Sequence, residues 1–194
     1  MLKKIARRIL VHLASTQKKI NAQLDSALGA AALGKVTSKG PNCVMGGDGQ
    51  LIDPQNLQLG EDVYIGRNFF IRATGHISIG SHTHISRNVV LHTVNHNTNG
   101  DLLPYDRTNV LRPIKIGQYV WIGMNCEVLP GVSIGDGAII GMGTTVAKDV
   151  APGAIVVGSA QRVVGSRDAE RTAALEKNGQ FLRIKNGWAS NDQQ

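Results

Sequence analysis

A six-residue period governs the middle of this chain and limits the folds that it can adopt. Every sixth residue from 116 to 146 is a β-branched aliphatic: Ile116, Ile122, Val128, Ile134, Ile140 and Val146. Two shorter blocks upstream keep the same period, first Leu59, Ile65, Ile71 and Ile77, then Ile79, Ile85 and Leu91. Three hexapeptides make one triangular coil of about eighteen residues, with one branched aliphatic pointing inward from each face.

This period predicts an all-β solenoid, a parallel β-helix, over residues 41–164. Aromatic residues make up only 4% of the chain, so the core must consist of Ile, Val, Leu and Ala. A glycine often follows the repeat aliphatic, as at Gly117, Gly123, Gly135 and Gly141. We expect these glycines to supply the permissive backbone angles of the corners.

The period is interrupted twice. A two-residue shift falls around Ala73–His76, and residues 97–113 form a polar segment without any six-residue pattern. We expect this segment to be a loop that projects from one corner of the prism. Long insertions in compact folds are usually functional or disordered, and the tightly repetitive flanks favour a functional loop.

The two ends of the chain differ from the repeats. Residues 1–40 are predicted to be helical from about Leu2 to Leu33, with an apolar stripe on one side and Lys and Arg on the other. The stripe consists of Ile5, Ile9, Leu13, Ile20, Leu24 and Leu28. A short second helix is predicted at residues 168–182, within a C-terminal segment 165–194. Open solenoid ends need covering, so we expect both helices to act as caps. Reversible membrane attachment of the basic N-terminal helix is the alternative.

The net charge of +7 indicates an anionic partner. No nucleic-acid-binding signature is present, which favours a phosphorylated cofactor or an acidic membrane surface. Cys43 and Cys126 match no metal or redox spacing and are expected to be reduced thiols of a cytoplasmic protein. The start of the chain lacks a signal-peptide pattern, and no run reaches the ~18 apolar residues of a membrane span.

The segment from Ile114 to Val164 contains the phrases Ile-Lys-Ile-Gly, Val-Trp-Ile-Gly and Val-Leu-Pro-Gly-Val-Ser-Ile-Gly, and it ends near Gly-Ser-Ala-Gln-Arg. It resembles the hexapeptide-repeat O-acetyltransferases, which include galactoside, maltose and surface-polysaccharide acetyltransferases. The resemblance extends over about Leu57 to Val164, and the family usually has Pro where this chain has Ala160. It implies a left-handed parallel β-helix, a homotrimer with sites between subunits and acetyl-CoA as acyl donor, without a metal or a permanently bound cofactor.

Acetyl transfer to a hydroxyl requires a base, and neutral histidine suits that role because its unperturbed pKa is about 6.5. Six histidines compete: His12, His76, His82, His84, His92 and His96. His96 is predicted to close the last regular repeat and to open the loop, and by position it matches the family's catalytic histidine. His92, one residue after Leu91, is the alternative.

The resemblance also implies two sets of binding residues. The acceptor is expected to contact Asn95, Asp101, Tyr105 and Trp121. Acetyl-CoA is expected to contact Trp121, Gly123, Gly141, Gly143, Thr145, Lys148 and Arg162. In this interpretation the glycines let the pantetheine arm approach and offer N–H groups to its amides, while Lys148 and Arg162 meet the phosphates.

The predicted function is therefore acetyl-CoA-dependent O-acetylation of a saccharide hydroxyl, in the biosynthesis or modification of a surface polysaccharide. The expected location is the cytoplasm or the inner face of the membrane. Alternatives are an N-acetyltransferase of an amino sugar, a xenobiotic acetyltransferase, a γ-class carbonic anhydrase and a non-catalytic trimer. The carbonic anhydrase needs three zinc ligands, which the histidine spacing does not provide.

Overall fold

The computed structural model describes residues 2–158, 168–178 and 180 of the chain. The chain divides into two compact units. The first, here called the solenoid unit, contains Met1–Thr93 and Arg112–Ser159. The second, here called the hairpin unit, contains Val94–Leu111 and Ala160–Gln194.

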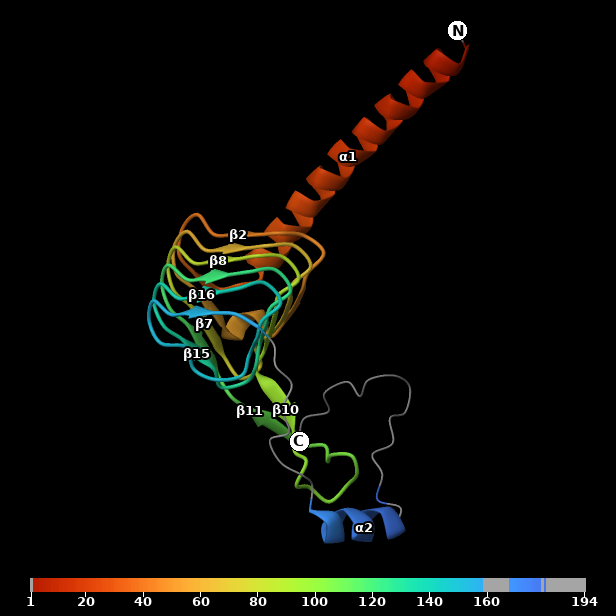
Figure 1. The fold of residues 1–194 in the computed structure, drawn as a ribbon. Coiled ribbons are helices and arrows are strands. Elements are labelled where there is room, and N and C mark those ends of the chain that lie inside the picture. Colours follow the sequence, from red (N-terminus) through yellow and green to blue (C-terminus); the bar gives the residue numbers. More distant parts are fainter. Residues whose placement is uncertain (1, 159–167, 179, 181–194) are drawn as a thin grey trace. The chain divides into compact units, whose positions relative to one another are not determined.

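The solenoid unit is built from three parallel sheets that the chain visits in turn, coil after coil (Figure 1). The first sheet holds β1 (Ser38–Lys39), β4 (Leu57–Leu59), β7 (Ile77–Ile79), β12 (Ile114–Ile116) and β15 (Ser133–Ile134). The second holds β2 (Val44–Met45), β5 (Tyr64–Ile65), β8 (His84–Ile85), β13 (Trp121–Ile122), β16 (Ile139–Ile140) and β18 (Ile155–Val156). The third holds β3 (Gln50–Ile52), β6 (Phe70–Arg72), β9 (Val90–His92), β14 (Glu127–Val128) and β17 (Thr145–Val146). A 3-10 turn, Pro54–Asn56, precedes β4. The predicted β-solenoid is confirmed, and its first strand begins at Ser38, before the expected start at residue 41.

The core of the solenoid is the stack of repeat aliphatics. Every residue of the three six-residue series is buried, and none is more than 6% exposed. In-register pairs stack them on one another, as with Ile65 on Ile85 and Ile122 on Ile140. Full burial of each such side chain contributes about 1.5–3 kcal/mol to folding. The six-residue period is thus the pattern of the core.

The glycines that follow the repeat aliphatics are required for close packing between coils, so the expectation of special backbone angles is wrong. A Cβ added to Gly123 would lie 2.7 Å from the Met142 backbone nitrogen. The left-handed angles fall further along the coil, for example at Asp62 (φ 53°) and Asn88 (φ 59°). Asp and Asn tolerate this conformation better than most other residues.

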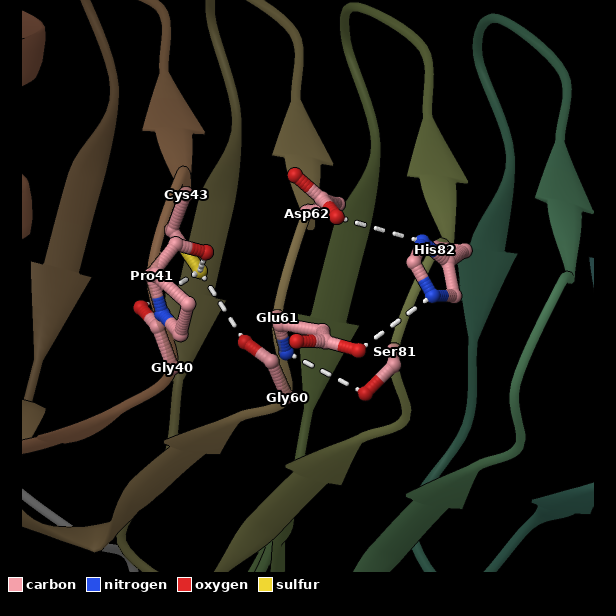
Figure 2. Close-up of polar contacts among 8 residues, drawn as sticks. All are labelled: Gly40, Pro41, Cys43, Gly60, Glu61, Asp62, Ser81 and His82. Atoms are coloured by element: carbon pink, nitrogen blue, oxygen red, sulfur yellow. Dashed lines mark hydrogen bonds and ion pairs between the residues drawn. The ribbon is translucent and has the colours of Figure 1, made fainter.

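Side chains at one corner connect successive coils, as Figure 2 shows. The Cys43 thiol donates to a backbone carbonyl of the next coil at 3.1 Å, and the Glu61 N–H donates to the Ser81 hydroxyl at 3.1 Å. His82 lies 3.5 Å from the Glu61 carboxylate and 3.4 Å from that of Asp62. These contacts give His82 a structural environment at a solvent-facing corner.

Both predicted interruptions are present. The first is a turn at residues 73–76, where the His76 N–H donates to the Ala73 carbonyl. The second begins after Thr93, whose hydroxyl donates to the Arg72 carbonyl at 2.6 Å and accepts from the Gly75 N–H. The coil resumes at Arg112, and β7 pairs directly with β12 across the insertion.

The hairpin unit contains an antiparallel pair, β10 (Val94–His96) and β11 (Asn109–Leu111), and helix α2 (Ala169–Lys177). Arg171 of α2 donates to the Gly100 carbonyl at 2.6 Å and lies 3.2 Å from the Asp101 carboxylate. The predicted loop 97–113 therefore has wrong boundaries, because its arms are strands that begin at Val94 and end at Leu111. Helix α2 is shorter than predicted, and covering of the solenoid's C-terminal end by this helix stays a prediction.

The predicted N-terminal helix is confirmed as α1 (Leu2–Gly34) (Figure 1). Its C-terminal turns contact the first coils: Asp25 pairs with Arg67 at 2.7 Å, and Gly29 packs against the Met45 carbonyl. The apolar stripe does not take part, since its six side chains are 44–58% exposed. The contacts with the first coils are thus made by the C-terminal turns of the helix, with Ala32 and Leu33 packed against the core, and not by the stripe. In the described part of the chain, neither helix is long and apolar enough to cross a membrane.

Candidate active site

His96 lies on strand β10 of the hairpin unit, paired with Asn109 of β11. The expectation that it closes the last coil is wrong, because the coil ends at Thr93 and His96 follows on the arm of the hairpin. Its imidazole stacks on the Tyr105 ring, with ring centroids 3.8 Å apart and planes 6° from parallel. The structure thus brings together two of the predicted site residues.

The Asp106 carboxylate holds the base of this loop. One of its oxygens accepts from the Asn97 side-chain amide at 2.9 Å, and the other accepts from the Thr108 N–H at 2.7 Å. The Asp106 N–H donates to the Asn97 carbonyl in return. Gly100 is buried against Asp106, which leaves no room for a side chain. Asp106 falls within the predicted loop 97–113 but is not among the predicted site residues.

The ring nitrogens of His96 have no hydrogen-bond partner among the described residues, and the side chain is half-buried. The neighbouring Asn95 is exposed, and its side-chain oxygen accepts from the His96 N–H at 2.9 Å. Stacking on Tyr105 uses the face of the imidazole and fixes its plane. The ring nitrogens lie at the edge of the ring, so the stacking does not occupy them. An imidazole in this state can accept a proton from a bound hydroxyl.

His92, the alternative base, belongs to the wall of the solenoid. It stacks on Phe70 with ring centroids 5.9 Å apart, and it pairs in register with Arg72. Both contacts are with the preceding coil, so they indicate a structural role for His92. His82 and His84 have coil neighbours of their own, Tyr119 and Tyr64.

Trp121 is exposed on β13 and belongs to a row of outward-facing side chains along the second sheet. Successive strands place these residues in register: Val44, Tyr64, His84, Trp121, Ile139 and Ile155. Most of them are large and apolar, and Trp121 and Ile155 are 56% and 70% exposed. Tyr64 was not among the predicted site residues. The signal was available, because each member of this row directly precedes a residue that points inward.

Three of the predicted acetyl-CoA residues are glycines whose N–H groups are already used. Gly123 donates to the Ile140 carbonyl, Gly141 to the Val156 carbonyl and Gly143 to the Met124 carbonyl, all at 2.8–2.9 Å. The idea that these N–H groups serve the pantetheine amides is therefore wrong. Gly143 has a φ of +73° and open space around it, so the chain there can be approached closely.

The remaining predicted residues are distributed over both units. Thr145 and Lys148 are exposed on the solenoid, and the Thr145 hydroxyl lies 3.4 Å from the Glu127 carboxylate. Asp101 is on the hairpin unit beside Arg171. Arg162 lies outside the described residues. Across residues 2–158, 168–178 and 180, no three His, Cys, Asp or Glu side chains gather in a way that could hold a metal ion.

Residues 113–148 match the family described as bacterial transferase hexapeptide (six repeats). This segment of the chain consists of hexapeptide repeats. The match coincides with the coils from β12 to β17, where the six-residue core series is longest. The sequence-based resemblance to the hexapeptide-repeat acetyltransferases is thereby confirmed.

Two curated relatives of this hexapeptide-repeat protein carry acetyltransferase names. The galactoside O-acetyltransferase of Escherichia coli (strain K12) is 33% identical over 116 residues, which cover 59% of this chain and 46% of the relative. SAR2635 of Staphylococcus aureus (strain MRSA252) is 38% identical over 118 residues, 59% of this chain and 57% of the relative. The chain thus spans about half the length of the curated relatives that it matches.

Solved structures agree with this fold. A galactoside acetyltransferase in complex with coenzyme A is 28% identical, with a TM-score of 0.52 over 70% of this chain and 67% of the other. AntD, an N-acyltransferase from Bacillus cereus in complex with dTDP and 3-hydroxybutyryl-CoA, is 16% identical, with a TM-score of 0.55 over 77% and 94% of the two chains. The second likeness concerns the fold alone.

Proposed function

We propose that this hexapeptide-repeat protein is an acetyltransferase that moves the acetyl group of acetyl-CoA onto a saccharide hydroxyl, in the biosynthesis or modification of a surface polysaccharide. The observation that carries the proposal is the imidazole of His96, stacked on Tyr105 with both ring nitrogens unengaged among the described residues. The likeness to a galactoside acetyltransferase that binds coenzyme A supports the donor and the acceptor class.

In the proposed reaction, His96 removes the proton from the acceptor hydroxyl while its oxygen attacks the thioester carbon. The carbon–sulfur bond then breaks, and His96 returns the proton to the departing CoA thiolate. The products are an acetyl ester and free CoA thiol. Direct transfer of this kind requires one base, two bound substrates and no metal.

Binding of the substrates is assigned to two groups of residues. The acceptor would contact Asn95, Asp101, Tyr105 and Trp121. Acetyl-CoA would contact Trp121, Gly123, Gly141, Gly143, Thr145, Lys148 and Arg162. The exposure of Trp121, Thr145 and Lys148 supports their availability to a ligand.

The proposal includes a homotrimer in the cytoplasm. The apolar row on the second sheet supports an assembly, since exposed patches of this kind commonly mark protein interfaces. The free thiols of Cys43 and Cys126 support a reducing compartment. Light scattering on the full chain should give three times the 20.7 kDa monomer mass. A stable monomer with full activity would contradict the trimer.

The activity is tested with the purified protein, acetyl-CoA and a panel of galactosides, glucosides and amino sugars, followed by release of CoA thiol. The expected product is an ester, which mild alkali cleaves, whereas an amide would survive. Alkali-stable products from amino sugars alone would replace O-acetylation by N-acetylation. Absence of acetyl-CoA binding in calorimetry would refute the acetyltransferase proposal altogether.

A further inference from the structure

Helix α1 has two different sides along its length, and only one of them has a partner among the described residues. The stripe residues Ile5, Ile9, Leu13, Ile20, Leu24 and Leu28 are all exposed, as are Leu10 and Val11. Successive helical residues advance by ~100°, which places all six stripe residues within a sector of ~140°. A sector this wide is typical of a helix that buries one whole face.

The attachment of α1 to the first coils uses the opposite side. Asp25 and Gly29 make the contacts with Arg67 and Met45, and on the helical wheel they lie on average ~150° from the centre of the stripe. The solenoid therefore holds α1 by the side that carries the charges, and this attachment presents the stripe away from the coils.

The charge of α1 is of one sign over its first twenty-four residues. Six Lys or Arg occur there, and Asp25 is the first acidic residue of the chain. The cations with described side chains, Lys4, Arg7, Arg8, Lys18 and Lys19, are exposed and lie outside the apolar sector. Each such cation is attracted to an anionic lipid surface.

We propose that α1 lies in the surface of an anionic membrane, with the stripe inserted among the lipid chains and the Lys and Arg side chains at the headgroups. Wide apolar sectors opposite Lys- and Arg-rich faces are characteristic of helices that lie in the bilayer interface. This proposal is independent of the acetyltransferase activity. It adds a membrane surface to the partners of the protein.

Packing of α1 against copies of itself is the competing arrangement, and two features disfavour it. A coiled-coil seam alternates spacings of three and four residues, whereas the stripe runs 5, 9, 13 and 20, 24, 28, with Thr16 and Gln17 at the intervening turn. Neighbouring helices would also bring their Lys and Arg together, without acidic residues on α1 before Asp25 to pair with them.

The test is sedimentation of the full-length protein with vesicles of phosphatidylcholine alone or of phosphatidylcholine with phosphatidylserine. The wild type should bind the anionic vesicles and be released by high salt. Ile9→Gln combined with Leu13→Gln should weaken this binding at least ~10-fold, because two buried aliphatics are lost. The matched control is Ser15→Gln with Ala22→Gln, which places the same two amides on the exposed charged side and should bind like the wild type.

Three results would overturn the proposal. They are failure of the wild type to bind anionic vesicles, equal binding to both vesicle types at all salt concentrations, and equal loss in the control variant. Light scattering separates the competing arrangement, since a reduced oligomer mass of the Ile9→Gln/Leu13→Gln variant without vesicle binding by the wild type assigns the stripe to self-association. Circular dichroism verifies that both variants retain the helix.

Discussion

The imidazole of His96 lies 3.8 Å from the ring of Tyr105, with the two planes 6° from parallel. The two residues come from opposite parts of the insertion, His96 from β10 and Tyr105 from the loop that precedes β11. Stacking fixes the plane of the proposed base without occupying a ring nitrogen. In the proposed function Tyr105 orients the base and His96 transfers the proton, and the first two predictions below test these two roles.

His96→Ala should lower kcat by roughly 10²- to 10⁴-fold, the usual contribution of a positioned general base. Affinity for acetyl-CoA should change little, because the variant loses proton removal and not a contact with the donor. His92→Ala is the control and should be much milder, since His92 stacks on Phe70 in the solenoid wall. Normal turnover by the His96 variant with a dead His92 variant would transfer the role to His92.

Tyr105→Phe should keep nearly full activity, because the stacked ring remains. Tyr105→Ala should lower kcat by about 2- to 10-fold, the equivalent of one lost aromatic contact. Steady-state kinetics of both variants provides the measurement. Equal losses in the two variants would show that the hydroxyl, and not the ring, matters.

Trp121→Ala should leave the melting temperature of the protein almost unchanged, since the indole is 56% exposed. It should raise the KM for acetyl-CoA or for the acceptor by roughly 10-fold, as loss of an aromatic interface anchor commonly does. Ile155→Ala is the control, because Ile155 lies in the same exposed row but is assigned to neither substrate. Unchanged KM values for both substrates would remove Trp121 from the proposed site.

Gly123→Ala should destabilise the protein by about 1–3 kcal/mol, because the new Cβ would lie 2.7 Å from the backbone nitrogen of Met142. Gly34→Ala, at the end of α1 with open space around it, should be neutral or stabilising by up to about 1 kcal/mol. Urea denaturation of the two variants compares them directly. The same sign for both would argue against the steric explanation.

The core was predictable from sequence because its residues recur at a fixed spacing. Each repeat aliphatic, such as Ile122, stacks on its equivalent one coil away. Helix α1 was predictable because its apolar residues recur at helical spacing. The environment of His96 was not, because it depends on pairing with Asn109 across the insertion. The orientation of α1 was also missed, since the contact of Asp25 with Arg67 carries no periodic signal.

The insertion between Thr93 and Arg112 begins and ends at neighbouring points, because the Arg112 N–H donates to the Thr93 carbonyl at 2.9 Å. The coil therefore continues as though the intervening residues were absent, with Ile77 and Ile114 stacked in register. The insertion can therefore change without altering the coils on either side of it. In the proposed function, a change in the length or side chains of the insertion is expected to alter acceptor preference, while the coils of the solenoid keep their register.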